Sequence, residues 1–339
     1  MNPASIDPAP APPARVVFFG SGAFGLPTLQ HLAAAGRIRG VVSQPDKPAG
    51  RGGAPTPTPI AAWAREHLPG VPVLTPQSCN TPDIRDAIRA LPADAWVVIA
   101  FGQKLGPALL ADRFAINLHA SLLPRWRGAA PINAAVLAGD AETGNSVITL
   151  ADRMDAGLVL AQSRRPVPLD ATAGQLHDQL ASDGPALVDS VLAAHAAGTL
   201  APVTQDESLV TLAPKMSKAD GWVDFARPAE ECRARINGLS PWPGVAVTFR
   251  AQPLRLLRAT TSLAGVPPQI AHAAVALAHD AAPGTLLSGA EGLVGCAGGT
   301  VVRLLEVQAP GRKVVPWRDF ANGQRVESQE VLAGGRPSC

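Results

Sequence analysis

The sequence predicts an α/β protein with two domains, the first built on a parallel sheet and the second on short β-strands. The 339 residues exceed the usual size of one domain, and a hydrophobic content of 47% is sufficient for two cores. Over residues 15–203, apolar strand-like runs alternate with helical spacing, which is typical of βαβ units. Beyond residue 222, short apolar runs are separated by Gly and Pro turns, which is typical of a small β-barrel or sandwich.

The first domain is expected at residues 15–203, after a Pro- and Ala-rich tail at residues 1–14 that we expect to be disordered. Residues 95–100, AWVVIA, are fully apolar, as a central strand of a parallel sheet should be. Gly184-Pro185 predicts a kink or a break in the last helix. The strands are expected at residues 15–20, 38–43, 71–74, 95–100, 114–119, 145–150 and 158–168. The helices are expected at residues 26–36, 60–67, 83–90, 129–138 and 172–197. This alternation predicts a Rossmann-like domain.

The second domain is expected at residues 223–339, after a linker at residues 204–222. One helix is expected at residues 228–237, before the strands. The apolar runs that we interpret as strands lie at residues 245–249, 254–257, 292–296 and 301–307. Of the two all-β alternatives we expect an OB-like β-barrel. A small excess of Lys and Arg over acidic residues in this part indicates nucleic-acid binding only weakly.

The charge, the cysteine pattern and the lack of long apolar runs limit the classes of function that we expect for this chain. A formal net charge of +2 gives no strong global field for nucleic acid, although a local basic patch is compatible with it. The cysteines are scattered and none belongs to a CxxC or Cys/His pattern, so we expect reduced thiols and no metal. No run reaches about 18 apolar residues, and the N-terminal segment lacks the basic and apolar regions of a signal peptide. We therefore expect a cytoplasmic protein without a membrane partner.

A glycine-rich turn follows the first predicted strand. Gly20, Gly22 and Gly25 match the GxGxxG spacing of dinucleotide-binding proteins. Asp46 follows about 20 residues later, where such proteins carry an acidic residue that binds the ribose. Asp46 lies within a loop, however, and nothing downstream resembles a hydride-transfer site, so NAD binding is kept only as an alternative. Backbone amides of such a turn, at a helix N-terminus, suit an anionic group. We therefore expect Gly20, Ser21 and Gly22 to contact the substrate.

Residues 44–59 form an unusually long predicted loop that is rich in Pro and Gly. Loops of this length without secondary structure are often functional. Lys47 and Arg51 would let this loop reach the phosphates of a large anionic substrate. The alternative is a surface insert without a function.

Asn117 and His119 are the strongest candidates for catalysis. They are two residues apart in a predicted strand, so their side chains point to the same face. An amide can donate to a developing oxyanion, and an imidazole can move a proton near pH 7. The polar loop that follows, at residues 121–128, lies where open α/β sheets bind their ligands. The alternative is a hydrogen-bonded histidine without a catalytic role.

The next predicted strand leads into a second polar loop, residues 151–157, which we expect at the same edge of the sheet. This loop contains Asp152 and Asp155. A carboxylate beside His119 would orient the imidazole or accept a proton from an attacking amine. The commoner role of a loop aspartate is to cap a turn, and this remains the alternative.

Several stretches of the sequence resemble one known family. NLHASLLPRWRGAAPI, at residues 117–132, closely resembles the signature of the folate-dependent formyltransferases, and the resemblance covers residues 16–332. GSGAFGLPTL resembles the first turn and helix of that family, and QPDKPAGRG resembles its loop that reaches the acceptor end of tRNA. Residues 213–244 and the QAPGRK and DFANG motifs resemble the C-terminal part of the family members that act on tRNA.

The resemblance implies a set of site residues. The catalytic residues of the family correspond to Asn117, His119 and Asp155, the last because Met154-Asp155 matches a Met-Asp pair. A contact to tRNA corresponds to Arg51. The contacts to tetrahydrofolate correspond to Ser121, Leu122, Leu123 and Pro124, and the pterin pocket to Phe101, Gly102, Gln103, Lys104 and Leu105. The chain departs from the family where Val159-Leu160-Ala161 replaces Asp-Thr-Gly, which implies a shorter loop after Asp155, and where Asn133 replaces Gln.

The resemblance also implies an activity. The formyl group of 10-formyltetrahydrofolate would be transferred to the α-amino group of methionyl initiator tRNA, giving N-formylmethionyl-tRNA for translation initiation. The resemblance implies no metal or nucleotide cofactor, and we expect a monomer. Within the family, the alternatives are transfer to an amino sugar and hydrolysis of the formyl donor. Outside it, the alternatives are NAD binding and a nucleic-acid-binding module, which would leave residues 117–128 unexplained.

Overall fold

Residues 14–49 and 54–336 are described by the computed structural model, and they divide into two units that are not continuous in sequence. Among these residues, unit 1 takes those up to 125 together with 144–164 and 178–210. Unit 2 takes residues 126–143, 165–177 and those from 211 onward. The domain boundaries that the sequence predicts, at residues 203 and 223, stay a prediction.

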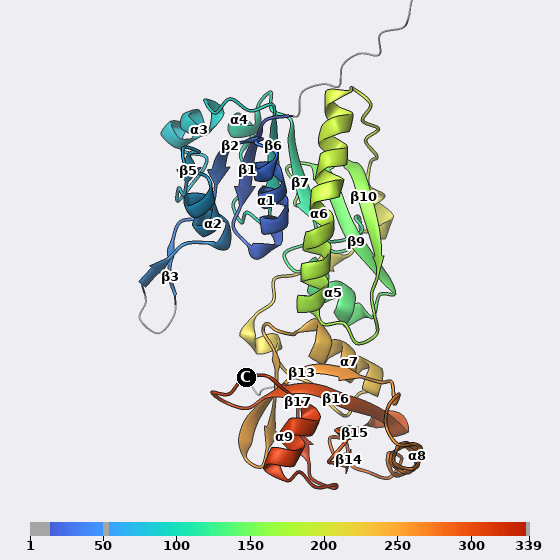
Figure 1. Cartoon of the computed structure of the whole chain (residues 1–339). Coiled ribbons are helices and arrows are strands. Elements are labelled where there is room, and N and C mark those ends of the chain that lie inside the picture. Colours follow the sequence, from blue (N-terminus) through green and yellow to red (C-terminus); the bar gives the residue numbers. More distant parts are fainter. Residues whose placement is uncertain (1–13, 50–53, 337–339) are drawn as a thin grey trace, which may run out of the picture. The chain divides into compact units, whose positions relative to one another are not determined.

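Unit 1 is built on a seven-stranded sheet with the strand order β10-β9-β7-β6-β1-β2-β5 (Figure 1). Its strands are β1 (Val16–Gly20), β2 (Ile38–Val42), β5 (Val73–Leu74), β6 (Ala95–Ile99), β7 (Ala115–His119), β9 (Glu142–Thr149) and β10 (Val159–Pro166). The five strands from β7 to β5 pair in parallel, which confirms the predicted parallel sheet. The central strands β1 and β6 are entirely buried, because apolar side chains on both faces pack into cores.

Strand β9 pairs with β7 in the antiparallel direction. His119 at the carboxyl end of β7 lies opposite Ser146, whereas Ile116 lies opposite Thr149. Strand β9 therefore begins, rather than ends, beside the carboxyl end of β7. We expected the loop after this strand to leave directly at the carboxyl edge of the sheet. This expectation was wrong about the direction of the strand. Strand β9 ends away from this edge, and the loop after it reaches the edge only by turning back.

The helices of unit 1 begin with proline in the first turn more often than with a side-chain cap, because proline loses no hydrogen bond there. They are α1 (Leu26–Ala34), α2 (Pro59–His67), α3 (Pro82–Arg89), α4 (Pro107–Leu110) and most of α6 (Ala173–Ala196), with two 3-10 turns, η1 (Ala23–Gly25) and η2 (Glu207–Leu209). Helix α6 continues through Pro185, so the break allowed by the sequence is not found. A Cβ at Gly184 would lie 2.8 Å from the Leu118 side chain, so glycine lets α6 pack closely against β7.

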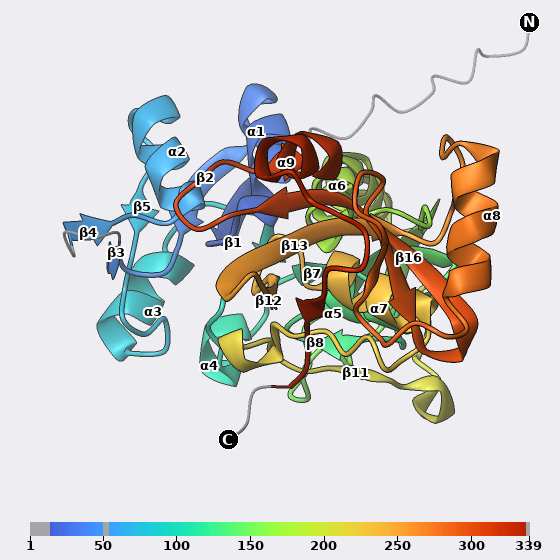
Figure 2. The same cartoon turned by 90° about the horizontal axis from the view of Figure 1, so that it is seen from below.

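The predicted loop at residues 44–59 contains a short antiparallel hairpin, which the sequence analysis did not predict. Its strands are β3 (Lys47–Ala49) and β4 (Ala54–Thr56), with Lys47 opposite Thr56 (Figure 2). The connection between the two strands lies outside the described residues.

Unit 2 is built on an antiparallel sheet with the order β14-β15-β16-β13-β12-β18, to which β17 is added beside β16. Its strands are β12 (Val245–Phe249), β13 (Gln252–Thr260), β14 (Leu286–Ser288), β15 (Leu293–Cys296), β16 (Thr300–Gln308), β17 (Val315–Pro316) and β18 (Leu332–Ala333). An antiparallel bridge between Thr285 and Val331 joins the residues next to the two edge strands. The sheet therefore nearly closes on itself, which confirms a β-barrel and excludes the sandwich.

The helices of unit 2 include two that the sequence predicted, at residues 129–138 and 228–237, and two that it did not. They are α5 (Pro131–Ala138), α7 (Ala229–Gly238), α8 (Pro268–Leu277) and α9 (Trp317–Gln324), with the 3-10 turns η3 (Lys218–Asp220) and η4 (Ala297–Gly299). Helix α7 confirms the helix expected at residues 228–237, whereas α8 and α9 lie between strands that were expected to follow one another. Within the described part of the chain, none of the helices could cross a bilayer.

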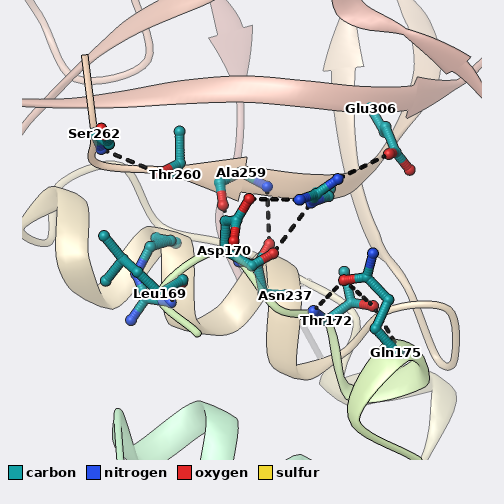
Figure 3. A network of polar contacts seen from close by, with 11 residues as sticks. Leu169, Asp170, Thr172, Gln175, Asn237, Ala259, Thr260, Ser262 and Glu306 are labelled. Atoms are coloured by element: carbon teal, nitrogen blue, oxygen red, sulfur yellow. Dashed lines mark hydrogen bonds and ion pairs between the residues drawn. The ribbon is translucent and has the colours of Figure 1, made fainter. Parts of the chain in front are cut away.

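Within unit 2, polar side chains connect three parts of the chain: the segment that precedes α6, helix α7 and strand β13 (Figure 3). The Asn237 side chain is fully buried, donates to the carbonyl of Ala259 at 2.8 Å and accepts from its N–H at 2.8 Å. Arg258 donates from Nε to the carbonyl of Asp170 at 3.1 Å and also pairs with the Asp170 carboxylate. A side-chain amide that satisfies both backbone groups of a strand residue stabilises a buried position that would otherwise lose two hydrogen bonds.

A first prediction concerns the buried cysteines. Burial raises the pKa of the Cys79 thiol to about 11, and its side chain is inaccessible. Because the thiolate is the reactive form, only about one thiol in a thousand would be ionised at pH 8. We expect iodoacetamide at pH 8 to leave Cys79 unmodified in the native protein and to alkylate it in urea, as measured by peptide mass spectrometry. Alkylation of native Cys79 at the rate of a free thiol would contradict the described packing.

Candidate active site

Asn117 and His119 are presented by β7 on the same face of the sheet. The intervening Leu118 points to the opposite face, where it meets Gly184 of α6. Asn117 is half-buried, and the His119 side chain is only 7% exposed. The parallel pairing of β7 with β6, in which Asn117 lies opposite Val98, fixes the backbone that carries both side chains.

The Asp155 carboxylate lies against both of these side chains. Asn117 donates from Nδ2 to Oδ1 of Asp155 at 3.5 Å, and Nδ1 of His119 lies 3.6 Å from Oδ2. The Asp155 side chain is only 13% exposed. These contacts are long for hydrogen bonds, as catalytic contacts often are before a substrate binds. The structure thus brings together the three residues that the resemblance assigns to catalysis.

The loop that carries Asp155 is closed at its base by Thr149, the last residue of β9. Thr149 donates its N–H to the carbonyl of Leu158 at 3.0 Å, and the N–H of Leu158 donates to Oγ1 of Thr149 at 2.9 Å. A Cβ at Gly157 would collide with the carbonyl oxygen of Thr149, so only glycine allows this closure. Asp155 itself has a φ of +53°, a left-handed conformation that costs energy for a residue with a Cβ.

The loop predicted to line the pterin pocket reaches the Asp155 loop. Lys104 donates from Nζ to the carbonyl of Asp152 at 3.3 Å. Gly102 is exposed and has a φ of +83°, whereas Phe101 and Leu105 are buried in the core of unit 1. Gln103 accepts from the N–H of Cys79 and donates to the carbonyl of Pro76, both at 3.0 Å. The parts of this loop left open to a ligand are therefore the backbone around Gly102 and the Lys104 side chain.

The segment predicted to contact tetrahydrofolate forms a tight turn directly after β7. The Ser121 hydroxyl is buried and donates to the carbonyl of Arg125 at 2.6 Å. Leu123 is also buried, whereas Leu122 and Pro124 are half-buried and offer apolar surface. Ser121 therefore shapes the turn, and its contact to folate stays a prediction.

The glycine-rich turn joins the ends of the central strands. Ser21 donates from Oγ to the carbonyl of Phe101 at 2.9 Å and accepts from the N–H of Gln44 at 3.1 Å. Gly20 ends β1, and the N–H of Gly22 donates to the carbonyl of Ala100 at 3.4 Å. The contact of Gly20, Ser21 and Gly22 to a substrate stays a prediction.

Asp46, the acidic residue of the dinucleotide-like spacing, pairs with Arg65 of α2 at 3.0 Å. Its carboxylate therefore already has a cationic partner within unit 1. Lys47 is exposed in the first strand of the hairpin, while Arg51 lies outside the described residues.

Three side chains that the sequence analysis did not single out contact the backbone of the predicted site residues. The buried Ser146 hydroxyl accepts from the N–H of Leu123 at 3.0 Å and donates to the carbonyl of Ser121 at 2.6 Å. Gln162 donates to the carbonyl of Leu123 at 2.9 Å, and Gln205 donates to carbonyls of the Asp155 loop. Ser146 carried little local signal, because β9 also contains the polar residues Thr143, Asn145 and Thr149. Gln205 carried no local signal, because it lies in a segment without periodicity.

The arrangement joins a hydrogen-bond donor, a proton carrier and a carboxylate around one point. Such a set can stabilise an oxyanion and move a proton between an attacking and a leaving group, which is the chemistry of acyl transfer. In the part of the chain that the structure describes, no group of three or more His, Cys, Asp or Glu side chains is placed to hold a metal ion.

Known proteins match this chain over most of its length. Residues 14–192 match the formyl transferase family, and residues 215–325 match the family described as formyl transferase, C-terminal domain. The chain is 38% identical over 320 residues to the methionyl-tRNA formyltransferase of Methylococcus capsulatus, covering 94% of this chain and 99% of the relative. It is 39% identical over 319 residues to the methionyl-tRNA formyltransferase of Geobacter sulfurreducens, covering 92% and 95%.

Among solved structures, the fold is similar to HypX from Aquifex aeolicus in complex with tetrahydrofolic acid. The TM-score is 0.60 at 14% identity, and the match covers 91% of this chain and 47% of HypX.

The closure of the Asp155 loop leads to a second prediction. Gly157→Ala should destabilise the protein by about 1–3 kcal/mol and lower its activity, because the added Cβ displaces the loop from Thr149. Gly323→Ala is the matched control, since its Cβ meets nothing in α9, and its stability should change by less than about 1 kcal/mol. Urea unfolding of both variants measures the difference. Equal stability of the two variants would contradict the close approach at Gly157.

Proposed function

This chain belongs to the formyl transferase family, and we propose that it transfers the formyl group of 10-formyltetrahydrofolate to the α-amino group of methionyl initiator tRNA. The observation that carries the chemistry is the position of the Asp155 carboxylate, within 3.6 Å of both Asn117 and His119. Methionyl-tRNA as the acceptor is supported by two relatives that the chain matches over nearly their whole length. Both are named methionyl-tRNA formyltransferase.

In the proposed site, the residues around Asn117, His119 and Asp155 have side chains and backbone groups that suit the binding of a folate. The open backbone around Gly102 offers hydrogen-bonding groups for the edge of a pterin, and Leu122 and Pro124 offer apolar surface for a flat ring. In this proposal Ser121, Leu122, Leu123 and Pro124, together with Phe101, Gly102, Gln103, Lys104 and Leu105, form the binding segment. When bound, 10-formyltetrahydrofolate supplies the activated formyl carbon.

Asn117 and His119 act on the developing negative charge. As the neutral amine attacks the formyl carbon, a new C–N bond forms and the formyl oxygen becomes an oxyanion. The Asn117 amide donates to this oxygen, and one such donor is worth about 2.7–4 kcal/mol in other acyl-transfer enzymes. His119 donates a proton toward the leaving folate nitrogen as the bond between that nitrogen and the formyl carbon breaks.

Asp155 accepts the proton that the attacking amine loses. Its carboxylate lies close enough to His119 for the proton to return to the imidazole afterwards, directly or through water. Both groups thereby regain their starting charge, and the products are the formylated amine and tetrahydrofolate. The buried positions of His119 and Asp155 restrict competing proton exchange with solvent.

We assign the binding of the tRNA acceptor end to the segment that contains Lys47 and Arg51 and to the glycine-rich turn. Lys47 is exposed on the hairpin, and Arg51 continues the same segment. Both would contact phosphates, and the backbone of Gly20, Ser21 and Gly22 would lie near the end of the acceptor. We further assign residues 15–203 to the catalytic domain and residues 223–339 to tRNA binding, and expect a cytoplasmic monomer.

A formyl-transfer assay tests this function. Purified protein is mixed with 10-formyltetrahydrofolate and either methionylated or uncharged initiator tRNA. The proposal expects N-formylmethionine to be released from the methionylated tRNA only, after hydrolysis of the ester bond. If no product forms while folate still binds, the acceptor is a different amine. An amino sugar then becomes the leading alternative.

A third prediction concerns His119. His119→Ala should lower the rate of formyl transfer by about 10²- to 10⁴-fold, because the leaving nitrogen loses its proton donor. His272→Ala removes an exposed imidazole from α8 and should leave the rate unchanged. Single-turnover kinetics and circular dichroism on both variants separate catalysis from folding. Turnover near the wild-type rate in folded His119→Ala would remove the imidazole from the mechanism.

A fourth prediction separates tRNA binding from folate binding. Lys47→Ala and Arg51→Ala should each raise KM for methionyl-tRNA, and less so at high salt, while folate affinity stays constant. Arg15→Ala removes one positive charge before β1, where Arg15 pairs with Asp94 on the exposed surface, and serves as the control. Unchanged KM for tRNA in both the Lys47 and the Arg51 variant would show that this segment of the chain does not bind tRNA.

A further inference from the structure

Gln205 makes two hydrogen bonds to the loop that carries Asp155. Its Nε2 donates to the carbonyl of Asp155 at 2.8 Å and to the carbonyl of Gly157 at 2.8 Å. The residue is only 7% exposed. A primary amide nitrogen has two hydrogens, so a single side chain can satisfy both carbonyls.

The segment around Gln205 is anchored to the same loop on both sides. Two residues before it, Val203 exchanges two backbone hydrogen bonds with Val159, both at 2.8 Å. Two residues after it, Glu207 pairs with Arg153 at 2.8 Å. Residues 203–207 therefore lie along residues 153–159, and Gln205 is held at the middle of that contact.

The Asp155 loop depends on such support because little apolar packing holds it. Met154, next to Asp155, is 71% exposed. Asp155 has a left-handed φ of +53°, a conformation that persists in a non-glycine residue only where neighbouring groups enforce it. Buried carbonyls also need donors, and those of Asp155 and Gly157 receive theirs from Gln205.

We propose that Gln205 is a positioning residue, which fixes the backbone of Asp155 so that its carboxylate stays against Asn117 and His119. The proposal rests on the formyl transfer proposed above, in which Asp155 accepts the amine proton. Gln205 acts through Asp155 and does not touch the reacting atoms. A carboxylate at position 205 could not donate to the two carbonyls, and an asparagine would be one methylene too short.

The first test is kinetic. Gln205→Met keeps the length of the side chain and removes both donors. We expect single-turnover formyl transfer to slow by about 10- to 100-fold, because a displacement of about 1 Å at a reacting group costs this much. KM for methionyl-tRNA and for the folate should change by less than about threefold, since neither binding segment is altered.

The second test asks whether Gln205 acts through Asp155. In an Asp155→Asn background, Gln205→Met should cause little further loss, since the group that it positions is already inactive. The control is Asn145→Ala, which removes another buried amide of unit 1, one that donates to the carbonyl of Leu180 at 2.8 Å on the side facing α6. It should lower stability without changing the transfer rate of the folded protein. An equal loss from Gln205→Met in both backgrounds would overturn the proposal.

A third readout does not depend on activity. Hydrogen exchange of the peptide covering residues 149–158 should be faster in Gln205→Met than in the wild type, and unchanged in Asn145→Ala. If the wild-type protein transfers no formyl group but this difference is found, the proposed function fails while the support of the loop stands. If the wild type is active and neither exchange nor rate changes, Gln205 does not position Asp155. Gln205→Asn provides the same comparison if Gln205→Met does not fold.

Discussion

The closure of the loop after β9 is the constraint on which the candidate site depends. Strand β9 runs away from the carboxyl end of β7, so a straight continuation would carry Asp155 away from His119. The two hydrogen bonds between Thr149 and Leu158 turn the chain back, and Gly157 allows the close approach that they need. The left-handed backbone at Asp155 costs conformational energy, which the surrounding contacts must offset. This cost, together with the position of the carboxylate beside the buried His119, indicates a functional site.

The rest of unit 1 provides a rigid base for that loop. The parallel pairing of β7 with β6 fixes Asn117 and His119, and close packing of α6 at Gly184 supports the opposite face of the strand. Because β9 begins beside the end of β7, Ser146 falls directly behind the turn at residues 121–125 and holds its backbone. The antiparallel direction of β9 therefore places Ser146 beside the turn at residues 121–125 and starts the loop that carries the Asp155 carboxylate.

Sequence patterns predicted what depends on local order, and missed what depends on distant pairing. Alternation along a strand placed Asn117 and His119 on one face, and apolar runs predicted the parallel sheet and the barrel. The residues alone did not choose between Asp152 and Asp155; the resemblance of Met154-Asp155 to a family motif did. The direction of β9 was wrong and the hairpin of β3 and β4 was missed, because propensity does not encode which strand becomes a neighbour. Helices α8 and α9 are local elements, and they were missed because the apolar runs on either side of them were interpreted as consecutive strands. Gln205 was missed for the same reason as the direction of β9, since it is 50 residues from Asp155 in the chain.

The central claim is that Asn117, His119 and Asp155 act as one catalytic unit in formyl transfer to methionyl-tRNA. The most direct measurement is the single-turnover transfer rate of Asn117→Ala, Asp155→Asn and the double variant. Residues that act as a unit show strongly non-additive losses, so the double variant should be about as slow as the slower single variant. Losses that multiply in the double variant would show that the two groups work independently, and would contradict the account.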